Sequence, residues 1–220
     1  MFPLSDSIKS ARFPFLNYAL IAITIYVFIL QLGNPDGMVE KYALIPAYIN
    51  FLNYRTLIPF ITAIFLHGGF MHIISNLWFL KIFGDNVEGQ LKSIPFLLLY
   101  FLAGIAGNFV QYLFMPNTAI PLLGASGAIA GVLGCYFILF PYSRIKTLLF
   151  IFFFVTITEV SATLMLGYWF VLQLFSAFGS IGAIGAQGGV AFFAHVAGFV
   201  VGIIFGKIYK NKGGQVLERI

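Results

Sequence analysis

The sequence predicts an all-α membrane protein, a bundle of six transmembrane helices with both termini in the cytosol. Of its 220 residues, 60% are hydrophobic and only 9% are charged, and the mean hydropathy is +0.98. A soluble domain carries about 25% charged residues, so the composition excludes an ordinary soluble protein. Six apolar stretches approach the roughly 20 residues that a helix needs to cross a bilayer. They cover residues 15–32, 61–83, 95–113, 126–140, 145–165 and 190–208.

The positive charges support this arrangement. Ten of the twelve Lys and Arg residues fall on one side of a six-span layout, and only Lys41 and Arg55 fall on the other. The excess of Lys and Arg marks the cytosolic side, which places both termini there. The formal charge of +5 is spread over loop ends instead of forming a patch, so we do not expect a nucleic-acid partner.

The chain is expected to consist of three regions, and two of its connecting stretches are unusual. Residues 1–14 are expected to be a cytosolic N-terminal segment, residues 15–208 the membrane domain, and residues 209–220 a basic cytosolic tail. The connection over 33–60 is rich in aromatic and aliphatic residues and should lie in the outer interface. The stretch 145–178 is too long for one crossing, so its outer part is expected to form a flexible cap. This cap would run on to the sixth span and contain Gly167, Gly179, Gly182 and Gly185.

Polar side chains on three spans fall at one depth. Ser126 lies 15 residues above the cytosolic edge at Pro141, roughly 22 Å up the helix. His195 lies 12 residues above Lys207, and His72 lies 12 residues above Gly84, each roughly 18 Å up from the cytosolic edge of its own span. Ionisable groups inside a membrane are costly and usually functional. A serine and a histidine at matching depth suggest proteolysis within the bilayer.

The spans that carry Ser126 and His195 also have the residues needed for close contact. Small residues recur at positions that let two helix backbones approach. They are Gly127, Gly131 and Gly134 in the fourth span, and Ala194, Gly198, Gly202 and Gly206 in the sixth. Ordinary glycine-mediated packing would explain these stripes alone. Together with the serine and histidine, they predict that an imidazole nitrogen of His195 reaches the Ser126 hydroxyl.

Three motifs resemble those of the rhomboid intramembrane serine proteases. They are His67-Gly-Gly-Phe-Met-His72-Ile-Ile-Ser-Asn76, Gly124-Ala-Ser126-Gly127, and Ala194-His195-Val-Ala-Gly198. The resemblance extends over nearly the whole chain, and the motifs occur in the family's order. In the second span it continues to Gly84-Asp-Asn-Val-Glu88. A GxSG string alone is weak evidence in a glycine-rich chain, whereas the joint pattern is specific.

The resemblance implies a role for each matching residue. Ser126 would be the nucleophile and His195 the general base, a dyad without a carboxylate. His72 and Asn76 are four residues apart on one helix face and would stabilise the oxyanion, with the Ser126 backbone N–H as a third donor. His67, Gly124, Gly127, Gly198 and Glu88 are expected to have structural roles near the site.

Two positions do not follow the resemblance. Some family members have an aromatic residue one turn after the nucleophile, where it packs on the catalytic histidine, and this chain has Ala130 there. Phe192, Phe193 and Phe199 are candidates for holding His195 instead. Glu159 lies in the predicted fifth span, where an intramembrane carboxylate suggests function. A protonated Glu bonded to a neighbouring hydroxyl is the plainer interpretation.

These residues imply a substrate and leave rival functions open. The implied substrate is a single-pass transmembrane protein cleaved near the external side, with no cofactor and no metal. One rival is a catalytically weak or inactive relative that binds transmembrane clients. A second is a channel or transporter that relays protons through His72, His195 and Glu159, and a histidine metal site is weaker still. The short chain, without an added domain or transit peptide, suggests a prokaryotic plasma membrane, and the oligomeric state is left open.

Overall fold

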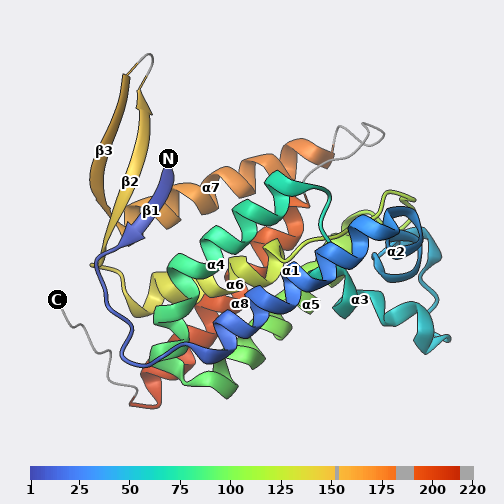
Figure 1. Ribbon diagram of the computed structural model, residues 1–220, viewed down its shortest axis with the longest axis horizontal. Helices are drawn as coiled ribbons and strands as arrows, with labels where there is room; N and C mark the ends of the chain where they lie inside the picture. The colour runs from blue at the N-terminus through green and yellow to red at the C-terminus, as the bar shows by residue number, and fades with distance from the viewer. Residues whose placement is uncertain (152–153, 182–190, 214–220) are drawn as a thin grey trace.

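A computed structural model describes residues 1–151, 154–181 and 191–213. Six helices of fourteen residues or more run side by side as a bundle, and a small sheet projects from one end (Figure 1). Helix α6 lies at the centre, packed against α8, α5 and α4, and every residue from Gly127 to Tyr136 is buried. The long helices are α1 (Phe15–Gly33), α4 (Phe70–Leu91), α5 (Ser93–Phe114), α6 (Ser126–Leu139), α7 (Ala162–Ile181) and α8 (Phe192–Asn211).

Four of these helices agree closely with the predicted spans. Helices α1, α5 and α6 begin and end within two residues of the first, third and fourth stretches. Helix α8 matches the sixth, although the predicted start at Val190 lies outside the described residues. By length and apolarity, α1, α5, α7 and α8 each qualify to cross a membrane.

The predicted second span is wrong as a single helix. The chain forms α3 (Pro59–Thr62) and a 3-10 turn over Ala63–Phe65, and then bends by 78° into α4. Gly69, the N-cap residue of α4, has φ +150, which a residue with a Cβ rarely adopts. The bend therefore depends on glycine and moves His67 off the helix. If the bent pair counts as one span, the described residues provide up to five spans, with α6 as a further, shorter apolar helix.

The predicted fifth span is also wrong, and the fold is mostly helical with one small sheet instead of all-α. Residues Arg144–Ile151 and Phe154–Ser161 form the antiparallel strands β2 and β3, and the crossing-length helix α7 begins only at Ala162. In β2, buried Ile145 and Thr147 alternate with exposed Arg144 and Lys146. Alternation with period two, in a run rich in β-branched residues, favours a half-buried strand over a helix.

The N-terminal segment completes the sheet. Strand β1 (Phe2–Asp6) pairs with β2, which gives the order β1-β2-β3 with both pairs antiparallel. The Trp78 indole on α4 donates a hydrogen bond of 2.7 Å to the Pro3 carbonyl, and Phe2 stacks on the same indole. These contacts fix the sheet to the bundle.

The remaining elements form the long connection between α1 and α4. It contains α2 (Pro35–Tyr42) and the 3-10 turns Pro46–Tyr48 and Tyr54–Leu57. Leu44 and Leu122 exchange backbone hydrogen bonds of 3.0 and 2.8 Å, which join this connection to the segment before α6. The connection therefore lies at the same end of the bundle as the start of α6.

Candidate active site

Ser126 occupies the first turn of α6. The first intrahelical bond runs from the Ile129 N–H to the Ala125 carbonyl, at 2.9 Å, and Ala125 has no side chain that could cap the helix. The N–H groups of Ser126, Gly127 and Ala128 therefore have no carbonyl partner within the helix. Unpaired N–H groups at a helix N-terminus favour negative charge, so an oxyanion next to the serine is stabilised there.

Helix α8 approaches this turn closely because glycines line the contact. A Cβ added to Gly198 would lie 2.0 Å from the Gly127 carbonyl oxygen, and one added to Gly202 would lie 2.0 Å from that of Gly131. A Cβ on Gly127 would meet the Ala194 carbonyl at 3.5 Å. The residues next to Ser126 and His195 are thus in contact, as the small-residue stripes predict.

The predicted hydrogen bond between the two catalytic candidates is not formed. No bond joins Ser126 Oγ to the His195 ring in the described part of the chain. Instead, His195 Nδ1 lies 2.7 Å from the amide oxygen Oε1 of Gln173 on α7. Helices α6 and α8 are therefore in contact next to both residues, at Gly127 and Ala194, without a hydrogen bond between Ser126 and His195 in the described residues.

Two rings lie against His195: Phe192, one of the three candidates from the sequence, and Trp169, which was not predicted from the sequence. Trp169 lies with its ring centroid 6.0 Å from that of His195 at an interplanar angle of 32°, and Phe192 approaches edge-on at 6.3 Å. Phe193 stacks on Phe114 instead, and Phe199 packs against Trp169. Trp169 and Gln173 share one face of α7, four residues apart. That spacing is visible in the sequence, but placing the fifth span too early hid it.

His72 lies against the turn that leads to Ser126. A Cβ on Gly124, whose φ is +125, would lie 2.8 Å from His72 Nε2. The Gly68 N–H donates to His72 Nδ1 at 3.3 Å, so a neutral ring carries its proton on Nε2 and points that donor toward Gly124. The Asn76 amide nitrogen donates to the His72 carbonyl at 2.9 Å and has a second hydrogen for another acceptor.

His67 and Glu88 form hydrogen bonds that connect α1 to the region of α4. Gln31 of α1 donates to the His67 carbonyl at 2.8 Å and accepts from its N–H at 3.0 Å. The Glu88 carboxylate accepts the N–H groups of Leu16 and Asn17, at 3.1 and 2.7 Å, which are free donors in the first turn of α1. These bonds fix α1 to the segment just before α4 and to the last turns of α4.

Glu159 is not in a membrane helix. It is exposed on β3 and is the cross-strand partner of Lys146. The sheet follows the C-terminal end of α6 and projects from that end of the bundle, whereas Ser126 begins α6 (Figure 1). The structure therefore gives no basis for a proton relay through His72, His195 and Glu159. Among the described residues, no group of three or more His, Cys, Asp or Glu side chains is placed to hold a metal ion.

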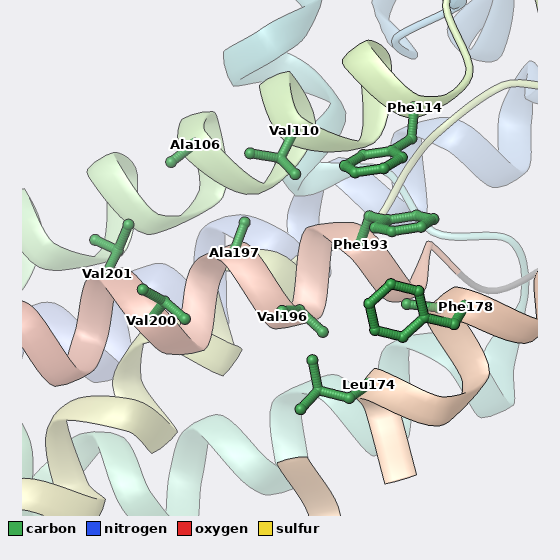
Figure 2. A pocket seen from close by; sticks show the side chains of 11 residues that line it. Ala106, Val110, Phe114, Leu174, Phe178, Phe193, Val196, Ala197, Val200 and Val201 are labelled. Carbon is green, nitrogen blue, oxygen red and sulfur yellow. The ribbon is translucent and has the colours of Figure 1, made fainter. Parts of the chain in front are cut away.

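An apolar pocket of about 430 Å³ lies beside the site, between α5, α7 and α8 (Figure 2). Its lining contains neither Ser126 nor His195. Side chains such as Val110, Leu174 and Val196 point into it, and none carries a polar group. Such a surface fits hydrocarbon and offers nothing for catalysis.

Comparisons with known proteins agree with the motifs. Residues 54–212 match the Rhomboid domain. Rhomboid protein 1, mitochondrial, of Saccharomyces cerevisiae is 33% identical over 87% of this chain and 52% of its own. The rhomboid protease GluP of Bacillus subtilis is 35% identical over 55% of this chain and 24% of its own, and the putative rhomboid protease YdcA of that organism is 41% identical over 34% and 38%. The chain therefore spans about half or less of these relatives. The match to the family covers α4 to α8 and all three motifs, and the chain belongs to the rhomboid family.

Proposed function

We propose that this protein is an intramembrane serine endopeptidase that uses Ser126 and His195 as a catalytic dyad. The observation that carries the proposal is the meeting of three elements at one point. Helix α6 begins at Ser126, the His72 ring lies against the preceding turn, and α8 contacts Gly127 next to the serine. The names of the Bacillus relatives, which include a rhomboid protease, support the same chemistry.

In this mechanism, Ser126 Oγ attacks the scissile carbonyl while His195 Nε2 accepts its proton. His195 then donates that proton to the leaving amine, and water hydrolyses the acyl-enzyme. The His72 Nε2–H, the free hydrogen of the Asn76 amide and the Ser126 N–H stabilise the oxyanion. Removing one such donor typically slows acyl transfer by about 10²–10³-fold. The chemistry requires no cofactor.

The substrate is a single-pass transmembrane protein cleaved near the external surface. Helix α6 has 14 residues and a length of about 21 Å, which is shorter than the roughly 30 Å hydrocarbon core. With α6 as the fourth of six crossings and both termini cytosolic, Ser126 lies below the external surface. A helical substrate hides its carbonyls, so the segment that is cut must unwind locally.

The first experiment is labelling of the purified protein in liposomes with a fluorophosphonate probe, which requires no known substrate. We expect labelling of the wild type and loss of labelling in both Ser126→Ala and His195→Ala. Ser75→Ala is the matched control, because Ser75 is an exposed serine on α4 whose hydroxyl bonds only to its own helix, at the His72 carbonyl. Folded wild type that does not react would contradict the protease proposal and favour a client-binding role.

The compartment belongs to the same proposal. A prokaryotic plasma membrane agrees with the Bacillus relatives, whereas other relatives carry mitochondrial or chloroplastic names. Fractionation of cells that express the tagged protein assigns the membrane. Protease accessibility of tags at the two termini tests the six-span topology, because both tags should be cleaved only from the cytosolic side.

A further inference from the structure

We propose that Gln173 is a positioning residue for His195, holding the imidazole in the tautomer whose Nε2 is free to take the proton from Ser126. The inference rests on the proposed function and deepens it. In a Ser-His-Asp triad, a carboxylate bonded to Nδ1 sets the tautomer and orientation of the histidine. Here a neutral amide on α7 has that place.

The assignment follows from the atoms involved. His195 Nδ1 and Gln173 Oε1 are 2.7 Å apart, which is a short hydrogen bond. An amide oxygen has no hydrogen and can only accept, so the proton is on Nδ1. A neutral imidazole carries one proton, which leaves Nε2 with a lone pair. A general base requires that lone pair, and α8 contacts Gly127, next to Ser126, through Ala194 and Gly198.

The face of α7 that carries Gln173 makes a second contact with the His195 ring, through an aromatic side chain. Trp169 precedes Gln173 by four residues, so both side chains lie on one face of α7. The Trp169 indole packs on His195 and also on Phe199, whose ring is 5.9 Å away and whose position is one turn further along α8. On the α6 side, Ala130 offers no ring. Helix α7 therefore supplies a polar and an aromatic contact to His195, in addition to the edge-on contact from Phe192 of α8 itself.

A purely structural role for Gln173 would also explain its contact with His195, but it predicts different effects of substitution. A glutamine in a membrane helix needs a hydrogen-bond partner, and a histidine ring would satisfy it. That role predicts a loss of folding stability in variants and no effect on the tautomer. The positioning role predicts that the protonated nitrogen of His195 changes when Gln173 is replaced.

The decisive measurement is the ¹⁵N spectrum of the histidine rings, because the two tautomers of a neutral imidazole have distinct nitrogen shifts. The chain has three histidines, so variants of His67 and His72 assign the His195 signals. We expect His195 in the wild type to be protonated at Nδ1 alone. In Gln173→Leu, we expect a mixture of tautomers and a fluorophosphonate labelling rate that is about three- to tenfold lower, as for the loss of one neutral hydrogen bond.

Two further variants separate positioning from packing. Gln173→Glu keeps the acceptor and should keep the Nδ1–H tautomer, with labelling at least as fast as in the wild type. Gln111→Leu is the matched control, because Gln111 on α5 accepts the Ala194 N–H at 3.3 Å and leaves the His195 ring alone. It should leave the His195 tautomer unchanged.

The outcomes are distinct. His195 protonated at Nε2 in the wild type would overturn the proposal, as would a wild-type tautomer and labelling rate in folded Gln173→Leu. If Gln173→Leu fails to fold, the wild-type spectrum alone decides. If the wild type shows the Nδ1–H tautomer but labelling is absent, the proposed catalytic dyad is contradicted, whereas the Gln173–His195 hydrogen bond is supported.

Discussion

Replacing Gly198 with Ala should force α6 and α8 apart. We expect a large fall in the rate of fluorophosphonate labelling and only a moderate loss of folding stability. The added Cβ would lie 2.0 Å from the Gly127 carbonyl oxygen, whereas real Cβ contacts are essentially never shorter than 3.0 Å. The carbonyl must therefore retreat by at least about 1 Å. Because that atom belongs to the backbone of the Ser126 turn, no rotamer change can relieve the clash.

The two expected effects differ in size. Overpacking of a well-packed contact costs roughly 1–3 kcal/mol of stability. A misplacement of about 1 Å between reacting groups can cost about 10²-fold in rate. Gly198→Ala should therefore lower the midpoint of thermal unfolding moderately and reduce fluorophosphonate labelling by about two orders of magnitude.

The matched control is Gly179→Ala on α7, where an added Cβ meets nothing within 4 Å. Alanine has the higher helix propensity, so this variant should be neutral or slightly more stable and should label at the wild-type rate. The measurements are the labelling rate and the unfolding midpoint in one detergent for all three proteins. Wild-type labelling by Gly198→Ala would refute the reasoning, because the helices would then tolerate a separation that the geometry forbids.

Three other changes test the scaffold. Glu88→Gln places an amide donor against the free N–H groups of α1 and should cost about 1.5–3 kcal/mol of unfolding free energy, measured by denaturant titration. Gln31→Leu leaves the buried N–H and carbonyl of His67 unpaired and should cost about 1–3 kcal/mol by the same titration, so an unchanged midpoint would contradict the stabilising role of these hydrogen bonds. Burial raises the pKa of Asp6 from 3.8 to about 6, although bonds from Tyr136 and Asn86 oppose the rise. The folded state then holds this proton more tightly, so stability should fall as pH rises from about 4 to about 6, and Asp6→Asn should flatten that dependence of the unfolding midpoint.

The sequence determined the parts of this protein that depend on composition and local periodicity. Long apolar runs bounded by polar residues predicted α1, α5, α6 and α8 within a few residues, because a membrane helix needs an uninterrupted apolar stretch. The small-residue stripes predicted the close contact of α6 and α8, since only glycine lets two backbones approach to this distance. The motif residues predicted a site around Ser126, and the His72 ring lies against the turn before that serine.

Only the tertiary structure decided features that depend on contacts between distant segments. The hairpin of β2 and β3 has an apolar run long enough for a helix, and pairing with the N-terminal strand shows that it is a sheet. The break before α4 depends on one backbone angle at Gly69. The support of His195 by Trp169 and Gln173 comes from a helix whose register could not be read until its start at Ala162 was known. Local patterns fix where apolar surface must be buried, whereas the orientation of the His195 ring depends on which helix packs beside it.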